Sequence, residues 1–208
     1  MEAVRVLFVT DLGVVSEDVL SRRLAAAASL APELRARLAV QLREPEMEGG
    51  AKAAFGARLR EATAPLGVKL VVNDRLDIAL LLGADGVHLG RRSVPVRAAR
   101  ELVGTAFVTR ACHDLDEVLS SAAEGADGAL LSPIFPSPGK GAPLGLEALS
   151  RARAALDARR HERFRLFALG GVDADNARFC FEAGADAIAV VRADLGNALA
   201  ALLAPARK

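Results

Sequence analysis

Polar side chains follow two early apolar runs of this 208-residue sequence, in patterns that suit anion and metal binding. Gln41 and Arg43 come after the first run, and Asn73, Asp74 and Arg75 come after the second. Guanidinium groups bind phosphate, and a carboxylate beside substrate phosphates is a common Mg²⁺ ligand. Asp74 is therefore the candidate metal ligand, although an Asp directly before a helical pattern is also an ordinary N-cap.

Histidine supplies the candidate acid/base group. His113 lies just past the apolar run Ala106–Thr109, which Arg110 follows directly. An imidazole titrates near working pH and can move a proton, whereas the alternative for His113 is a solvent-exposed neighbour of a helix cap at Asp114. His88 lies inside an apolar run, which indicates a hydrogen-bonded core histidine, and His161 lies in a charged segment, which indicates a solvated one.

The stretch Leu131–Leu146 reads LSPIFPSPGKGAPLGL and indicates a long loop that contacts a ligand. Its prolines and glycines exclude a regular helix or an internal strand, yet Ile134 and Phe135 are apolar. Lys140 stands between two glycines, where backbone and ammonium can approach an anion, and Ser137 adds a hydroxyl. A surface loop with an unrelated lysine is the alternative.

A second glycine-rich turn, Gly170-Gly171, precedes a helical pattern over Asp175–Ala183. Peptide N–H groups of a glycine turn before a helix favour phosphate. A later apolar run ends at Val191, and Arg192 follows it. Barrel enzymes often hold phosphate between the loops after strands seven and eight, so we expect these two segments to share one anion.

Eight apolar runs alternate with eight helical patterns, which predicts parallel strands joined by right-handed crossovers. We expect an α/β fold, a single (βα)8 TIM barrel domain over residues 1–208 with a parallel eight-stranded core; a doubly wound sheet is the alternative. Gly-Ala-Asp tags at residues 83–85, 125–127 and 184–186 each end a helix before a strand. The predicted strands are Val4–Thr10, Leu38–Leu42, Val68–Val72, Gly86–Leu89, Ala106–Thr109, Gly128–Leu131, Arg165–Leu169 and Ala187–Val191. The predicted helices are Ser16–Leu30 (ended by Pro32), Ala51–Thr63, Leu76–Leu82, Val96–Leu102, Asp114–Glu124, Leu146–Leu156, Asp175–Ala183 and Leu195–Leu203.

In such a barrel the candidate residues follow the carboxyl ends of the strands, where barrel enzymes bind substrate. They are Gln41, Arg43, Asn73, Asp74, Arg75, Arg110, His113, Ser137, Lys140, Gly170, Gly171, Val191 and Arg192.

Composition excludes several classes of function. The formal net charge is +1 and aromatic residues are scarce, so neither a nucleic acid nor a membrane surface is an expected partner. The arginine pairs, such as Arg22-Arg23, are interpreted as solvated faces. Cys112 and Cys180 lack metal-ligand spacing and are expected to be reduced and buried. With no signal peptide and no apolar run long enough to cross a bilayer, we expect a cytoplasmic protein.

These motifs together resemble the thiamin phosphate synthase family and its TenI-type thiazole tautomerase relatives. The matching segments run in the expected order and are VQLRE (Val40–Glu44), NDRLDIALLLGADGVHLG (Asn73–Gly90), PIFPSPGK (Pro133–Lys140), PLGLEAL (Pro143–Leu149), LGGVDADN (Leu169–Asn176) and AGADAIAVV (Ala183–Val191). The resemblance implies a barrel enzyme of thiamin biosynthesis. A synthase joins an aminopyrimidine methyl diphosphate to a thiazole phosphate with the help of Mg²⁺. By this resemblance Gln41, Arg43, Asn73, Asp74 and Lys140 would face the diphosphate, and Gly170, Gly171 and the end of strand eight would hold the thiazole phosphate.

Three departures from the synthase pattern favour the tautomerase. Pro45 replaces the usual lysine, Ser93 replaces a metal-binding aspartate, and Ala111 replaces a serine hydroxyl. TenI-type proteins have lost the metal site, keep the thiazole phosphate pocket and use a histidine at the position of His113. We therefore expect a thiazole tautomerase with His113 as acid/base and no cofactor. The alternatives are a synthase with a depleted Mg²⁺ site, because Asp74 and the PSPGK segment are intact, and a non-catalytic binder of a phosphorylated ligand. A homodimer is compatible with either.

Overall fold

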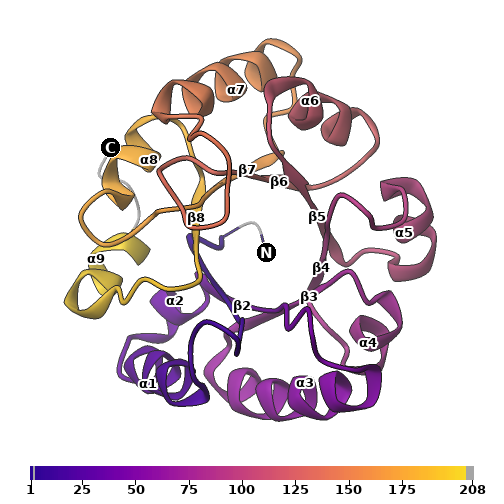
Figure 1. Cartoon of the computed structure of the whole chain (residues 1–208), viewed down its shortest axis with the longest axis vertical. Helices are drawn as coiled ribbons and strands as arrows, with labels where there is room; N and C mark the ends of the chain where they lie inside the picture. Colours follow the sequence, from indigo (N-terminus) through magenta and orange to yellow (C-terminus); the bar gives the residue numbers. More distant parts are fainter. Residues whose placement is uncertain (2, 205–208) are drawn as a thin grey trace.

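The computed structural model describes residues 1 and 3–204, and in this part of the chain eight parallel strands close into a barrel in sequence order. Figure 1 looks along the barrel, with the strands as an inner ring and the helices around it. The predicted TIM barrel is confirmed, and the doubly wound alternative is excluded because β1 pairs with β8. The strands are β1 Val6–Val9, β2 Leu38–Leu42, β3 Lys69–Asn73, β4 Gly86–Leu89, β5 Phe107–Cys112, β6 Gly128–Leu131, β7 Arg165–Leu169 and β8 Ala187–Val190.

Most strand residues are apolar, because most of each strand is buried on both faces. Residues such as Val40, Val108 and Ile188 pack outward against the helices in one large core cluster. Alternate residues such as Leu130 and Phe167 point into the barrel and form a second, smaller cluster there. Side chains alternate along each strand, so every second residue points into the barrel and the others point toward the helices.

Every predicted helix and strand is present, and three differences from the predicted elements concern the site or the helix layer. The chain forms an extra helix, α2, where Pro32 occupies the first turn that its fixed φ favours, rather than only ending α1. Strand β5 continues to Cys112, three residues beyond the predicted end. Helix α8 begins at Ala177 instead of Asp175. The helices are α1 Glu17–Ala28, α2 Pro32–Arg35, α3 Gly49–Thr63, α4 Leu76–Leu81, α5 Val96–Val103, α6 Leu115–Ala123, α7 Leu146–Ala158, α8 Ala177–Glu182 and α9 Leu199–Leu203, with 3₁₀ turns η1 Ala64–Leu66 and η2 Gly196–Ala198.

The Gly-Ala-Asp tags build one repeated arrangement at the amino ends of the strands. Each Asp carboxylate accepts the N–H of the second residue of the preceding strand, at 2.7–2.9 Å, and pairs with an Arg from the helix before that strand. The sets are Asp85 with Leu70 and Arg60, Asp127 with Val108 and Arg100, and Asp186 with Leu166 and Arg153. Each tag therefore ties two strands and a helix together at the end opposite the expected site.

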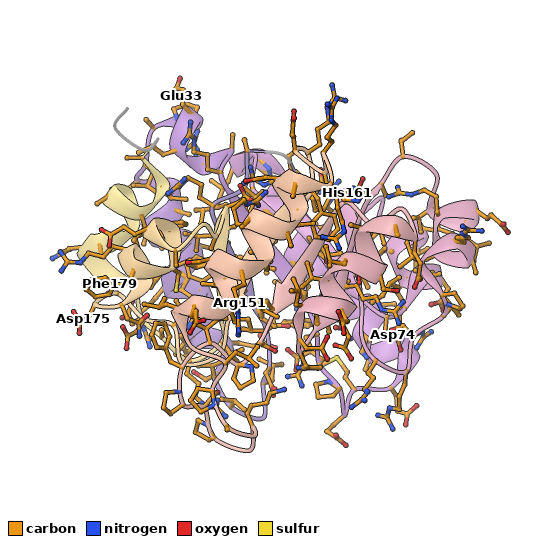
Figure 2. All side chains as sticks on the ribbon, turned by 90° about the horizontal axis from the view of Figure 1, so that it is seen from above. Glu33, Asp74, Arg151, His161, Asp175 and Phe179 are labelled. Atoms are coloured by element: carbon orange, nitrogen blue, oxygen red, sulfur yellow. The ribbon has the colours of Figure 1, made fainter. Side chains whose placement is uncertain are left out.

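The two ends of the barrel differ in what they carry. Figure 2 views the barrel from the side, with Asp74 and Asp175 toward the end that holds the loops after the strands and His161 toward the other end.

Cys112 and Cys180 are free and buried, as predicted. Among the described residues no helix has the length and apolar character needed to cross a bilayer.

Candidate active site

His113 is held in a fixed orientation at the end of β5. Its Nδ1 lies 2.8 Å from the carbonyl oxygen of Ser132, which follows β6. A carbonyl oxygen only accepts, so Nδ1 carries the proton and Nε2 of the neutral ring is left as a base. The backbone is fixed as well: the His113 N–H donates to Glu117 Oε2 at 2.7 Å, and Asp114 Oδ1 accepts the Glu117 N–H at 2.8 Å. This capping of α6 holds His113 at the carboxyl end of the barrel.

The upper interior of the barrel is polar on the side of β2 to β5. Gln41 Nε2 donates to Asn73 Oδ1 at 3.1 Å, and His88 Nδ1 donates to Thr109 Oγ1 at 2.9 Å. The buried Gln41 Oε1 has no hydrogen-bond partner among the described residues. That oxygen is an acceptor available to a ligand that carries an N–H or O–H group.

His88 is the hydrogen-bonded core histidine that the sequence indicates. It is buried, and its Thr109 partner also donates to the carbonyl oxygen of Val87 at 3.3 Å. Burial, assisted by the charge of Arg43, lowers the pKa of His88 to about 4. His88 is therefore neutral at physiological pH.

The opposite side of the interior is apolar. Leu169 at the end of β7 and Val191 just beyond β8 are half-buried there, and both pack on the buried interior cluster that contains Phe167 and Ala189. The barrel mouth therefore has a polar half and an apolar half, an arrangement that suits a flat heterocycle with polar substituents on one side.

The loop between β6 and α7 packs on the glycine turn after β7, and Figure 1 shows it beside β7 and β8. Ile134 and Phe135 donate their N–H groups to the carbonyl oxygens of Leu169 and Gly170, both at 2.9 Å. A Cβ on Gly171 would lie 2.6 Å from the carbonyl oxygen of Pro136. The loop approaches this closely only because glycine occupies the turn.

The predicted helix N-terminus at this turn is wrong. Helix α8 has six residues and begins at Ala177. Asp173 Oδ1 accepts the N–H groups of Asp175 and Asn176 at 3.0 and 3.1 Å, so a polar turn precedes the helix. Among the described residues, the N–H groups of Gly170 and Gly171 have no protein acceptor. Any anion here would bind to loop amides, without a substantial helix dipole.

Lys140 and Ser137 lie in a tight turn at the tip of the same loop. The Lys140 N–H donates to the Ser137 carbonyl oxygen at 3.1 Å, and the Lys140 side chain is exposed. The ammonium forms no ion pair with any described residue. It is thus available to an anion that enters under the loop.

Two predicted anion-binding arginines already have acidic partners. Arg43 forms an ion pair with Asp11, in the loop after β1. Arg75 contacts both carboxylate oxygens of Asp77, with Nε at 2.8 Å, and this pairing lowers the pKa of Asp77 to about 2. Either guanidinium must leave its carboxylate, or share it, to bind a phosphate.

Arg110 does not reach the barrel mouth, which corrects its predicted role. It pairs in register with Leu89 of β4, whose side chain belongs to the outer core cluster. Arg110 therefore faces the helix layer, where Nη1 lies 3.2 Å from Glu124 Oε2. Arg110 joins β5 to the end of α6.

The end of β8 is held by a residue that sequence reasoning missed. Arg23 of α1 is buried and donates to the carbonyl oxygens of Val191 and Ala193, both at 2.8 Å. Arg192, between them, is exposed. The interpretation of Arg22-Arg23 as a solvated face is wrong for Arg23. Arg23 follows Leu20 by three residues in the helical pattern, and this spacing indicates that it shares the buried face of the helix with Leu20.

The donor set near Asp74 fits Mg²⁺ poorly. Asp74 is exposed and has a left-handed backbone, with φ of 64°, and its N–H donates to the His88 carbonyl oxygen at 2.8 Å. Ser93, after the next strand, offers a hydroxyl that accepts the Gly90 N–H at 2.7 Å. The described residues contain no cluster of three or more acidic, His or Cys side chains able to hold a metal. With one carboxylate, Asp74, most ligands of a bound Mg²⁺ would have to come from substrate phosphates and water.

Comparison with known proteins points to one family. The family model described as "Thiamine monophosphate synthase" matches residues 6–193. The chain is 39% identical over 157 residues to a "Thiamine-phosphate synthase" of Chloroflexus aurantiacus, covering 74% of this chain and 70% of the relative. It is 37% identical over 199 residues to the protein of the same name from Methanoculleus marisnigri, covering 90% and 88%.

A solved structure agrees with the sequence comparisons. "Thiamine phosphate pyrophosphorylase" from Pyrococcus furiosus superposes with a TM-score of 0.79 at 27% identity, over 97% of this chain and 93% of that one. The matched residues include the polar strand ends, the β6 loop and the glycine turn described above. This chain belongs to the thiamine monophosphate synthase family, the enzymes of thiamine biosynthesis.

Proposed function

We propose that this protein is a thiazole tautomerase, in which His113 moves the proton that converts an exocyclic thiazole phosphate tautomer into the aromatic thiazole. One observation carries the proposal: His113 Nδ1 donates to the Ser132 carbonyl oxygen at 2.8 Å, which leaves Nε2 as a base at the barrel mouth. An acid/base and an anchor for one phosphate are sufficient for this reaction.

The proton balance of the reaction is simple. His113 Nε2 accepts a proton from the ring carbon, and the electron pair of that C–H bond moves into the ring as the exocyclic double bond is lost. A proton is then delivered to the former exocyclic carbon, by the imidazolium in the simplest case. No atom is gained or lost overall, and Ser132 stabilises the imidazolium because its carbonyl oxygen faces the Nδ1–H.

The remaining site residues receive binding roles. We assign the phosphate to the free amides of Gly170 and Gly171, to the segment at Val191 and Arg192, and to Lys140. The thiazole ring lies against the apolar half of the mouth. Gln41 and Asn73, with Ser137 on the loop, contact the polar side of the substrate. Arg43 and Arg75 stay with their carboxylates, because a single phosphate does not require both.

A thiamin phosphate synthase is the second candidate. Curated relatives with 37–40% identity carry that name, and Lys140 and Asp74 remain. The family resemblance would then imply a pyrimidine diphosphate as second substrate and Mg²⁺ as the diphosphate counter-ion. Against it, Ser93 and Pro45 remove a carboxylate and an ammonium from the diphosphate side. No step is assigned to Mg²⁺, because the donor set falls short.

Two assays on the same preparation test the proposal. In the first, the phosphorylated tautomer alone is followed by ultraviolet absorbance as the ring becomes aromatic. In the second, the pyrimidine diphosphate and the aromatic thiazole phosphate are incubated with Mg²⁺, and product is measured by chromatography. We expect catalysed aromatisation without coupling. Coupling without aromatisation would establish the synthase instead, and tight thiazole phosphate binding with neither activity would indicate a non-catalytic binder.

A further inference from the structure

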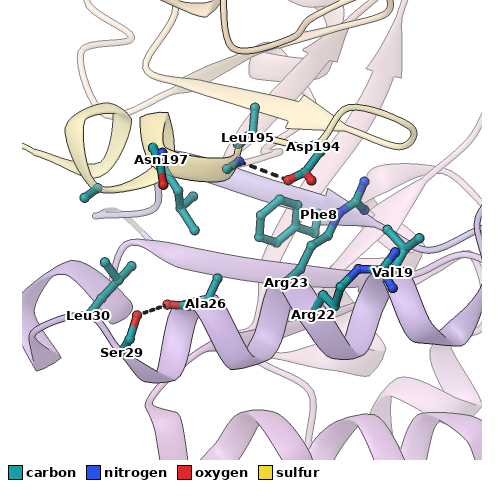
Figure 3. Close-up of a pocket in the computed structure, with 13 residues that line it drawn as sticks. Phe8, Val19, Arg22, Arg23, Ala26, Ser29, Leu30, Asp194, Leu195 and Asn197 are labelled. Carbon is teal, nitrogen blue, oxygen red and sulfur yellow. Dashed lines mark hydrogen bonds between the residues drawn. The ribbon is translucent and has the colours of Figure 1, made fainter.

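Arg23 is a buried cation in the helix layer directly behind the end of β8. It is 6% exposed, and its guanidinium carbon lies 5.0 Å from the centre of the Phe8 ring. Both hydrogens of its Nη2 are used, one toward the Val191 carbonyl oxygen and one toward that of Ala193, each at 2.8 Å. Figure 3 shows Arg23 extending from α1 beside Phe8. Both residues line a cavity of about 450 Å³.

No carboxylate is bonded to this cation. Among the described residues Arg23 forms no ion pair, and its buried Nε has no hydrogen-bond partner. The nearest acidic influence is Asp194, whose Oδ1 instead accepts the N–H of Gly196 at 3.0 Å. Burial lowers the pKa of Arg23, and Asp194 opposes this in part. A buried charge of this kind costs stability unless an anion or oriented dipoles offset it.

The two carbonyl contacts fix the direction of two amides. In a trans peptide, C=O and the following N–H point in opposite directions. Since the oxygens of Val191 and Ala193 face Arg23, the N–H groups of Arg192 and Asp194 point away from it. Neither N–H has an acceptor among the described residues. Two free amides and an exposed guanidinium at Arg192 thus project from one short segment, which is the geometry of an anion-binding turn.

We propose that Arg23 is a positioning residue of the phosphate site, which orients the Arg192 and Asp194 amides toward a phosphate monoester and adds its own positive charge behind them. This inference rests on the phosphate anchor of the proposed function. It adds α1 to the elements that build this anchor. None of the site residues predicted from the sequence lies in α1. Arg23 itself does not touch the phosphate, because the loop lies between them.

The test compares Arg23→Met and Arg23→Lys with a matched control, Arg5→Met. Arg5 also lies over a phenylalanine ring, at 4.1 Å from the centre of Phe181, and donates to a backbone carbonyl oxygen, that of Leu202 at 3.1 Å. It precedes β1, so it lies at the opposite end of the barrel. The control therefore removes a similar packed arginine far from the phosphate site.

Two measurements are made on each variant. Binding of inorganic phosphate is measured by titration calorimetry, and KM and kcat are measured with the phosphorylated thiazole tautomer. For Arg23→Met we expect the phosphate Kd and the KM to rise about tenfold or more, with a much smaller change in kcat, because a charge-assisted contact network is lost. Arg23→Lys should recover part of the affinity, and Arg5→Met should bind phosphate like the wild type.

Equal phosphate affinity in the wild type and in both Arg23 variants would overturn the inference, as would an equal loss in Arg5→Met. Absence of phosphate binding by the wild type would also overturn it. If Arg23→Met does not fold, Arg23→Lys decides, since lysine keeps the charge on a side chain one bond shorter, which sets its ammonium back from both carbonyl oxygens. Phosphate titration needs no chemistry, so a failed tautomerase assay with Arg23-dependent phosphate binding would reject the proposed function and keep this inference.

Discussion

His113 Nδ1 and the carbonyl oxygen of Ser132 lie 2.8 Å apart, across the ends of two neighbouring strands. The Ser132 N–H also donates to the Cys112 carbonyl oxygen at 3.0 Å, so the pairing of β5 and β6 continues to the histidine itself. The ring is thereby oriented by main-chain atoms, which no side-chain substitution at Ser132 removes. The register of β5 and β6 therefore determines which ring nitrogen of the neutral His113 carries the proton.

The first prediction concerns the tautomer of His113. Because its Nδ1 donates to Ser132, the neutral ring should carry its proton on Nδ1 and leave Nε2 unprotonated. Nitrogen chemical shifts from long-range ¹H–¹⁵N correlation spectra distinguish the two tautomers, and His113→Gln assigns the signal. A neutral ring protonated on Nε2 would contradict the proposed role of that nitrogen as base.

The second prediction concerns the close packing of the β6 loop on Gly171. Gly171→Ala would combine a left-handed backbone, φ 65°, with a contact of 2.6 Å to Pro136. Gly67→Ala is the matched control, since Gly67 has φ of 72° and open space around it. We expect the control to lose about 1 kcal/mol of unfolding free energy and Gly171→Ala to lose about 1–3 kcal/mol more. Urea unfolding measures both, and equal losses would mean that the loop moves aside freely.

The third prediction concerns stability in acid. The pKa of His88 is about 4 in the folded protein, below the ordinary value of 6.5. The unfolded chain therefore binds the extra proton between these values, so stability is full above pH 6.5 and falls as pH drops toward 4. The contribution is on the order of 3 kcal/mol. Urea midpoints measured across this range should fall less steeply in His88→Gln than in the wild type or in His161→Ala, and parallel curves for all three would refute the burial effect.

The fourth prediction concerns metal. If the tautomerase needs only His113 and a phosphate anchor, excess chelator should change its rate by less than about twofold. Ser93→Asp should add the second carboxylate beside Asp74, because the two residues follow adjacent strands. We expect Mg²⁺ to raise the thermal midpoint of Ser93→Asp but not that of the wild type or Ser93→Asn. A wild-type rate abolished by chelator would contradict the metal-free account.

The barrel was predictable from sequence because each strand is a short apolar run bounded by turn residues. Strands such as Leu38–Leu42 and Gly128–Leu131 are buried on both faces, so their composition alone indicates a parallel sheet with helices around it. His88 was also predictable, since a histidine between Val87 and Leu89 has to find a partner in the interior.

The site was less predictable, because its errors arise from contacts between distant residues. Three extra pairs lengthen β5 past Thr109, so Arg110 is part of the strand and faces the helix side, and a shift of one residue reverses the face of any strand position. Likewise, the partner of Arg43 is Asp11, 32 residues away, and the partners of Arg23 lie at the other end of the chain. The charge pattern of a short sequence segment does not indicate which distant residue will be the partner of an arginine.

The most direct test of the account is the rate at which the purified protein aromatises the phosphorylated thiazole tautomer, before and after loss of the His113 imidazole. His161→Ala is the matched control, because that histidine lies at the opposite end of the barrel. We predict that the wild type and His161→Ala are equally active and that His113→Ala is slower by about 10²- to 10⁴-fold, with phosphate affinity unchanged. A His113→Ala rate within about twofold of the wild type would contradict the central claim.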